Sequence, residues 1–264
     1  MSYDQLATFL AVADRLAAMD DDTRPEAAPT LTKRDALVFL TLADAGLRPG
    51  EALALRWEDI DVAGRLVHVE RAVSGGIVKA TKTEETRFID LSRRLADALD
   101  RWQAQAEADA LVDGRDVSLW VFPSRTGEPL EVRSLAKRFR AVLRAAKLPK
   151  SRLYDLRHTY ATQLLESGAP ITYVADQLGH TKPTTTLTYY AHWLPRGDRV
   201  LIDRLIDARS AANATVPADL WHQVGTNFDD RGNELAQVRE ILGEPSGTRT
   251  QDPLIKSQVL CHLS

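Results

Sequence analysis

Apolar residues recur at helical spacing along most of this chain and switch to strict alternation in only one region, residues 66–91. Helical spacing places apolar side chains on one face of a helix, whereas alternation buries every second residue of a strand. The pattern predicts a mainly α fold with a small antiparallel β-sheet, an α+β domain. The expected helices are Tyr3 to Met19, Lys33 to Asp44, Ser92 to Leu111, Glu131 to Lys147, Asp155 to Ser167, Ile171 to Leu178, Pro183 to Tyr190 and Asp198 to Ala208.

The alternating region predicts three short strands, at Leu66 to Ala72, Gly76 to Ala80 and Arg87 to Leu91. Residues 81–85 form the turn between the second and third strands, so Lys82 is expected on a loop. Upstream, Gly46 and Pro49 end the second helix. Arg48 is therefore expected at a turn rather than inside a helix.

The composition excludes several protein classes. A chain of 264 residues with 44% hydrophobic content can bury a substantial core in one or two domains. Cys261 is the only cysteine and no Cys/His spacing suits zinc, so we expect neither an internal disulfide nor a metal. No apolar run approaches the roughly 20 residues of a membrane span, and no basic-then-apolar signal follows Met1. We therefore expect a cytoplasmic protein without membrane contact.

Charge is distributed unevenly along the chain. The net charge of −3 argues weakly against a nucleic-acid partner, yet between Arg133 and Arg157 only Asp155 opposes a dense basic run. A basic helix can be merely a solvated face, but this one leads directly into Tyr154 and Arg157. We therefore interpret it as a surface that contacts phosphates. The residues assigned to it are Arg133, Lys137, Arg138, Arg140, Arg144, Lys147, Lys150 and Arg152.

Five segments carry polar residues whose types, order and spacing are hard to obtain by chance. They are AGLRPGEALALRWEDID from Ala45, ATKTEETRFIDL from Ala80, YDLRHTYAT from Tyr154, QLGHT from Gln177 and TTTLTYYAHWLP from Thr184. Together they resemble the catalytic domain of tyrosine recombinases of the phage-integrase family. The resemblance covers residues 33–205 and implies the fold of that domain. It also implies a DNA strand-exchange enzyme that acts on double-stranded DNA in the integration or excision of a mobile element.

These residue types suit the breaking of a phosphodiester without a metal. Displacement at phosphorus builds charge on the non-bridging oxygens, which the planar, permanently charged side chains of Arg48 and Arg157 can stabilise. The same cations would favour the ionised form of the nucleophile Tyr190, whose pKa is ordinarily about 10. The resemblance assigns a phosphate hydrogen bond to His180 and protonation of the leaving oxygen to Lys82. Because a phosphotyrosine stores the ester bond, no cofactor is expected.

Some of these assignments have alternatives. Arg48 taken alone could be a helix-cap arginine, and Lys79 competes with Lys82 for the role of the hairpin lysine. Tyr189 is the alternative nucleophile. The Ala-His-Trp-Leu-Pro that follows resembles the family's ending and favours Tyr190.

One position departs from the family pattern. Tyr154 lies three residues before Arg157, where the family usually has histidine. A tyrosine hydroxyl can donate to a phosphate oxygen, but it cannot relay a proton near neutral pH, so we expect a reduced rate. Glu51, one helical turn from Arg48, is expected to hold that guanidinium or else to be a surface acid at a helix start. His158 is expected to be structural.

The resemblance also implies partners and boundaries. We expect a catalytic domain over residues 1–209 and a partly flexible tail over residues 210–264. The segment Arg199 to Ala208 is the candidate helix that docks into a neighbouring subunit, which would couple four active sites in a homotetramer on DNA. Accessory DNA-bending factors are further candidate partners. The upstream DNA-clamping domain of the family is not in this sequence, so we expect weak DNA binding.

Two other functions fit the same residues. A type IB topoisomerase would use the same chemistry to relax DNA, but the GLRPGE and LGH segments favour an integrase. A catalytically impaired, DNA-binding remnant of an integrase is the alternative that Tyr154 motivates.

The tail suggests a target for recombination. Codons for Thr248 to Thr250 can be the reverse complement of a tRNA T-arm, and codons for Leu254 to Gln258 that of an anticodon arm with the lysine anticodon. The resemblance implies an attachment site close to the gene, so a lysine tRNA gene is the expected site. The alternative is a disordered tail of chance composition.

Overall fold

The computed structural model describes residues 1–19, 28–80, 86–180, 182–193 and 199–214. Its contacts divide the chain into two units, Met1–Arg196 and Gly197–Ser264. The second unit contributes one described helix, α9 (Arg199–Ala214). Lys82 lies outside the described residues, and so does the tail segment whose codons could match a tRNA gene.

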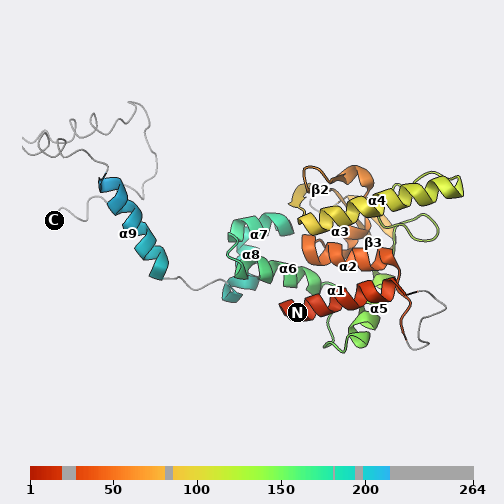
Figure 1. Cartoon of the computed structure of the whole chain (residues 1–264), viewed down its shortest axis with the longest axis horizontal. Helices are drawn as coiled ribbons and strands as arrows, with labels where there is room; N and C mark the ends of the chain where they lie inside the picture. Colours follow the sequence, from red (N-terminus) through yellow and green to blue (C-terminus); the bar gives the residue numbers. More distant parts are fainter. Residues whose placement is uncertain (20–27, 81–85, 181, 194–198, 215–264) are drawn as a thin grey trace, which may run out of the picture. The chain divides into compact units, whose positions relative to one another are not determined.

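Four long helices build the main core of the first unit: α1 (Tyr3–Ala17), α2 (Lys33–Ala45), α4 (Arg93–Asp113) and α5 (Val132–Ala145) (Figure 1). Helix α2 is central and packs against the other three. Phe9, Phe39 and Phe139 meet in this core with ring centroids 4.8 to 5.8 Å apart. Ser2 and Thr32 form capping boxes that satisfy the free backbone N–H groups and fix the starts of α1 and α2.

The strands among the described residues form two small antiparallel sheets. One has the order β1 (Ile60–Asp61), β2 (Leu66–Val69), β5 (Arg87–Asp90), and the other pairs β3 (Arg71–Ser74) with β4 (Ile77–Ala80). The single strand expected from Leu66 to Ala72 is thus wrong, because the chain breaks pairing at Glu70. Val69 pairs with Arg87 whereas Arg71 pairs with Ala80, so the two parts of the expected strand belong to different sheets.

A short helix and a group of three helices complete the first unit. They are α3 (Pro49–Leu53), α6 (Asp155–Glu166), α7 (Ile171–Leu178) and α8 (Pro183–Tyr190). Helix α6 packs on α2, and α7 packs on β5, so this group is attached to both the main core and the sheet (Figure 1). Its own apolar cluster includes Tyr160, Leu165, Val174, Leu178 and Tyr190.

The turn that ends α2 requires glycine. Gly46 has φ +60°, and a Cβ there would lie 2.2 Å from the ring of Tyr160. A side chain would therefore strain the backbone and displace the ring. This close contact brings α6 against the residues that precede α3.

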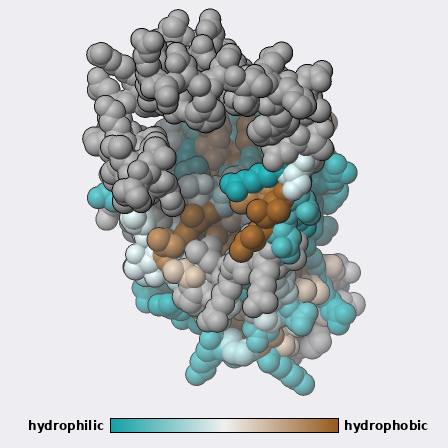
Figure 2. All heavy atoms as spheres, turned by 90° about the vertical axis from the view of Figure 1, so that its left-hand side faces the viewer, coloured by the Kyte–Doolittle hydropathy of each residue, from teal (hydrophilic) through white to brown (hydrophobic). Residues whose placement is uncertain are grey.

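In the second unit, α9 runs from Arg199 to Ala214, past the boundary expected at residue 209. Ile202, Leu205 and Ile206 are exposed and lie on one face of the helix by their spacing. Apolar side chains also reach the surface among hydrophilic ones on the face shown in Figure 2. Among the described residues, no helix has the length and apolar character needed to cross a membrane.

Candidate active site

Arg48 occupies the N-cap of α3, where Pro49 starts the helix. The side chain of Glu51 accepts a hydrogen bond from the backbone N–H of Arg48 (2.8 Å) and another from its Nη1 (2.7 Å). Glu51 is only 2% exposed. Burial alone would raise the pKa of this carboxyl, but hydrogen bonds and charge from Arg87 and Arg48 outweigh burial and lower it. The structure thus places Glu51 where the sequence suggested it would hold Arg48.

Arg87 is a site residue that the sequence analysis missed. It begins β5, and its Nη1 and Nη2 donate to the two carboxylate oxygens of Glu51 at 3.1 and 2.8 Å. Its Nε donates to the carbonyl of Gln177 at 3.4 Å. A Cβ on Gly179 would lie 2.7 Å from the Arg87 side chain, so only glycine allows this close contact. Arg87 therefore joins α3 to the end of α7.

Arg157 lies on α6 and is 2% exposed. Its Nη1 donates to the carbonyl of Gly46 at 2.8 Å, and its Nη2 donates to the carbonyl of Leu178. Burial, and then the positive charge of Arg48, lower its pKa to about 10. Two of its five N–H groups are used for anchoring, which leaves N–H groups for an anion.

His180 follows Gly179, which ends α7 in the left-handed conformation. Its Nδ1 lies 2.7 Å from the hydroxyl of the fully buried Thr186. Burial, followed by the charges of Arg157 and Arg48, lowers its pKa to about 4, so the ring is neutral at pH 7. When Thr186 donates this bond, the ring proton resides on Nε2, which can then donate to an acceptor.

Tyr190 ends α8 and is 4% exposed, whereas its neighbour Tyr189 is 63% exposed. The hydroxyl of Tyr190 lies 2.5 Å from Nδ1 of His158. His158 was expected to be structural, but the structure places it against the predicted nucleophile. Burial raises the pKa of Tyr190 to about 12, although Arg157 acts in the opposite direction. Arg157 thus favours the ionised hydroxyl, in the direction expected, but burial outweighs this effect in the free protein.

Tyr154 lies at the N-cap of α6 and is 39% exposed. Its ring packs edge-on against His158 with centroids 5.3 Å apart. Burial would lower the pKa of Arg48, but Glu51 and then Tyr154 raise it above its ordinary value. Tyr154 therefore lies beside both Arg48 and His158. Lys79 is exposed on β4, and Lys82 lies outside the described residues.

The electrostatics of these residues suit an anion. Arg48, Arg87 and Arg157, which we call the arginine cluster, face one another across the single carboxylate of Glu51. His180 adds no charge at pH 7. The site therefore has an excess of two positive charges in a partly buried position, where a phosphate would be strongly favoured. In the described part of the chain, no group of His, Cys, Asp and Glu side chains could hold a metal ion.

The predicted phosphate-contacting residues fall into two groups. Four of them are exposed along one face of α5, opposite its buried Leu135 and Phe139, and we call them the basic stripe: Arg133, Lys137, Arg140 and Arg144. Lys147 and Lys150 are also exposed. Arg138 instead donates to the fully buried Asp35 at 2.9 Å, and Arg152 contacts Asp155 at 3.4 Å. Arg138 thus ties α5 to α2.

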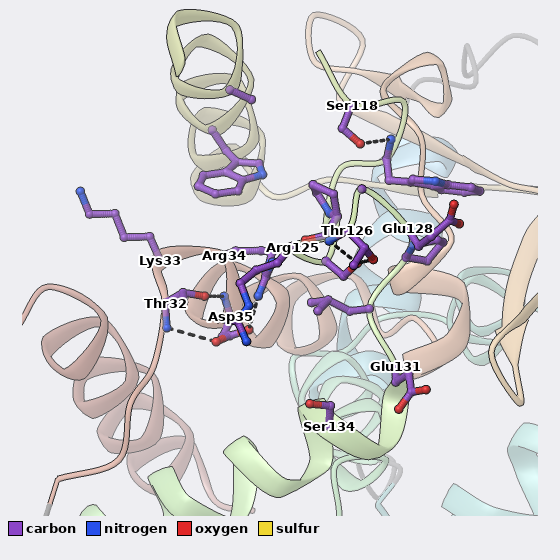
Figure 3. A pocket seen from close by; sticks show the side chains of 18 of the residues that line it. Thr32, Lys33, Arg34, Asp35, Ser118, Arg125, Thr126, Glu128, Glu131 and Ser134 are labelled. Atoms are coloured by element: carbon purple, nitrogen blue, oxygen red, sulfur yellow. Dashed lines mark hydrogen bonds and ion pairs between the residues drawn. The ribbon is translucent and has the colours of Figure 1, made fainter. Parts of the chain in front are cut away.

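In the part of the chain that the structure describes, there are hollows outside the arginine cluster. One of about 520 Å³ lies beside Tyr154, between α3, the β3–β4 turn and the start of α5. A larger one of about 1530 Å³ lies at the start of α2 and is lined by Arg34, Arg125 and three tryptophans, among others (Figure 3). It shares no residue with the arginine cluster, but Arg138 and Asp35 are among its lining residues.

A family model described as the phage integrase family matches residues 11–196, which is more than half of the chain. The chain belongs to the phage integrase family. This family member is 28% identical over 189 residues to a XerC-like tyrosine recombinase of Caldanaerobacter subterraneus subsp. tengcongensis, covering 64% of this chain and 48% of that protein. It is also 28% identical over 189 residues to the ICEBs1 integrase of Bacillus subtilis, covering 67% of this chain and 51% of the integrase. The chain spans about half the length of the curated relatives it matches.

Solved structures share the fold. XerA recombinase matches with a TM-score of 0.54 at 21% identity, over 79% of this chain and 64% of that one. The Tn1549 transposon integrase, solved with circular intermediate DNA, matches with a TM-score of 0.58 at 19% identity, over 78% of this chain and 66% of that one. The predicted fold class, mainly α with small antiparallel sheets, is therefore confirmed.

Proposed function

We propose that this chain is a site-specific DNA recombinase that cleaves and rejoins DNA through a covalent 3′-phosphotyrosine at Tyr190. The observation that carries the proposal is the buried Tyr190 hydroxyl beside an arginine cluster with excess positive charge. The integrase and transposase names among its relatives favour a role in integrating or excising a mobile element.

Each residue has a distinct part in the proposed cleavage. Arg48 and Arg157 hold the non-bridging oxygens of the scissile phosphate, and their charge stabilises the transition state. His180 donates a further hydrogen bond from Nε2. The Tyr190 hydroxyl attacks phosphorus, and the 5′ oxygen leaves with a proton from Lys82. Because the positions of Arg48 and Arg87 both depend on Glu51, this carboxylate acts as a positioning residue.

We propose that the basic stripe of α5 contacts the backbone of double-stranded DNA. Its four exposed cations recur at helical spacing on one face, which suits a row of phosphates. Arg138 is not free for this role, because its guanidinium is paired with Asp35.

A homotetramer on DNA is the proposed assembly, with accessory DNA-bending factors as further partners. Helix α9 supports it, because Ile202, Leu205 and Ile206 present an exposed apolar face that a neighbouring subunit could bury. Docking of α9 from each subunit into its neighbour would couple the active sites of adjacent subunits.

A nicked suicide substrate tests the proposed function. Cleavage near a nick releases a short 5′-ended fragment, so the covalent protein–DNA adduct accumulates and can be seen on a denaturing gel. We expect an adduct with the wild type and with Tyr189→Phe, and none with Tyr190→Phe, whose DNA affinity should stay nearly unchanged. An adduct with Tyr190→Phe but none with Tyr189→Phe would move the nucleophile to Tyr189.

The exposed Tyr154 favours a second candidate, a DNA-binding remnant with impaired catalysis. Wild-type protein that binds DNA but forms no adduct would support it. In an active enzyme, Tyr154→His should preserve or raise the cleavage rate, and Tyr154→Phe should lower it by on the order of 10-fold through loss of one donor.

A further inference from the structure

His158 makes the closest polar contact to the proposed nucleophile. Its Nδ1 lies 2.5 Å from the hydroxyl of Tyr190, and the two ring centroids are 5.8 Å apart. It follows Arg157 on α6, so the helix that anchors the arginine also places this imidazole. We infer that His158 is the general base that takes the hydroxyl proton of Tyr190 during DNA cleavage. The inference rests on the proposed function of this site.

The burial of Tyr190 makes a proton acceptor necessary. With a pKa of about 12, its hydroxyl is ionised in roughly one molecule in 10⁵ at pH 7. His158 is suited to accept the proton, because burial lowers its pKa below the ordinary value of 6.5 and keeps the ring neutral at pH 7. With the ring proton on Nε2, Nδ1 is free to accept from the hydroxyl.

Other groups described at the site are already engaged. Both oxygens of the Glu51 carboxylate accept from Arg48 and Arg87. Nδ1 of His180 lies in a hydrogen bond with Thr186. Tyr154 lies at the position where the family usually has histidine, and it has no imidazole. Within the described part of the site, His158 is thus the imidazole with a ring nitrogen at the nucleophile.

The proposed step balances in both directions. The Tyr190 O–H bond breaks and its proton moves to Nδ1 of His158, while the tyrosine oxygen bonds to phosphorus. The bond from phosphorus to the 5′ oxygen breaks, and that oxygen takes a proton from Lys82. In rejoining, the 5′ hydroxyl returns its proton to Lys82 and attacks the phosphotyrosine. The bond from phosphorus to the tyrosine oxygen breaks, and His158 returns its proton to that oxygen.

The experiment compares two suicide substrates in single turnover. In one, the scissile 5′ oxygen is replaced by sulfur, which leaves as a thiolate of low pKa and needs no proton. The sulfur substrate should restore cleavage by Lys82→Ala, because Lys82 acts on the leaving group. It should not restore cleavage by His158 variants, because His158 acts on the nucleophile. His158→Asn keeps an acceptor near the Nδ1 position but cannot take up a proton. We expect it to lower the rate on both substrates by on the order of 10²–10⁴-fold.

Two controls separate this role from general damage. His158→Asn should retain the wild-type DNA affinity and thermal midpoint, which excludes misfolding. His68→Asn changes a histidine of β2 whose described contacts are with Phe88 and Glu70, and it should cleave at the wild-type rate.

The pH profile gives a readout that a merely structural role would not move. On the sulfur substrate, the wild-type rate should fall as the pH drops through the His158 pKa, because the protonated ring cannot accept. This fall should be absent in His158→Asn. The charged and titratable groups that act on His158 are Asp155, Arg157, Arg152, the N-terminal amine, His180, Tyr154 and Tyr190, and all remain in the variant.

Three results would overturn the inference. Equal rates for His158→Asn and wild type on the sulfur substrate would show that no proton passes to this ring. A faster rate in the variant would show that His158 restrains Tyr190 instead of activating it. A wild-type protein without adduct on either substrate would overturn the proposed function together with this inference, whereas the first two results leave that function standing.

Discussion

The replacement Glu51→Gln tests how the arginine cluster is held together. The carboxylate accepts four hydrogen bonds, two from Arg48 and two from Arg87, and it is 2% exposed. A glutamine keeps the shape, but its NH₂ group faces guanidinium donors and cannot accept from them. The variant also leaves Arg48, Arg87 and Arg157 without a counter-charge. Removing one partner of a buried ionic network costs about 3–5 kcal/mol, so we expect a loss of this size in the free energy of unfolding.

Urea denaturation at pH 7 measures the loss. Glu58→Gln is the matched control, because Glu58 is 59% exposed and pairs with Arg56 at the surface. That pair should contribute less than about 1 kcal/mol. In the variant Glu51→Gln, added inorganic phosphate should raise the stability more than in the wild type, because the site then has one more uncompensated positive charge.

The pH dependence has a definite sign. The pKa of Glu51 in the folded protein is below its ordinary value of 4.5, so its stabilising effect is fully present above pH 4.5. The effect is lost as the pH falls through the lower pKa of the folded state. The stability difference between wild type and Glu51→Gln should therefore be largest near neutral pH and shrink in acid. A loss below about 1 kcal/mol at pH 7 would refute the reasoning that Glu51 holds the cluster.

Three further predictions concern the turn after α2, the basic stripe and His180. Gly46→Ala should lower the free energy of unfolding by at least about 1–3 kcal/mol in urea denaturation, since it strains a residue with φ +60° and meets the Tyr160 ring; an unchanged midpoint would contradict this. The double variant Arg133→Ala/Arg140→Ala should reduce the slope of log affinity for DNA against log salt by about 2. Arg138→Ala should leave this slope unchanged and lower the stability, because it removes the ion pair with Asp35. Equal slopes for both variants would show that the basic stripe does not contact DNA. In an NMR pH titration, His180 of the DNA-free protein should show a pKa of about 4. Added phosphate should raise this pKa, because an anion favours the imidazolium. A pKa near 6.5 would show that the ring is not in the field of the arginines.

Local patterns were sufficient to predict most of the fold. Helices α7 and α8 have the predicted bounds, Ile171–Leu178 and Pro183–Tyr190. Their apolar spacing and the flanking glycine and proline are all local signals. The break at Glu70 was missed, because strand pairing depends on which residues lie opposite and not on alternation alone.

The residues of the site likewise divide into those that local segments predicted and those that depend on tertiary contacts. Arg48, Arg157, His180 and Tyr190 were predicted from short segments, and the described structure places all four within one region of the first unit. Arg87, Thr186 and His158 act through partners that are distant in sequence or that depend on how a helix is rotated. His158 directly follows Arg157, so it lies to one side of that arginine on α6, but the sequence could not show that Tyr190 at the end of α8 lies on that side.

The anchoring of Arg157 has a consequence for the synthesis of the protein. Its guanidinium bonds to Gly46, which lies 111 residues earlier, and to Leu178, which lies 21 residues later. A chain emerging from the ribosome thus carries Gly46 and Arg48 well before Arg157, and it carries Arg157 before Leu178, which supplies the second anchoring carbonyl. Tyr190 emerges after all of them. Since the contacts that hold Arg157 form only when α2, α6 and α7 have packed, an incomplete chain lacks an assembled phosphate site. The proposed cleavage of DNA therefore requires the folded protein.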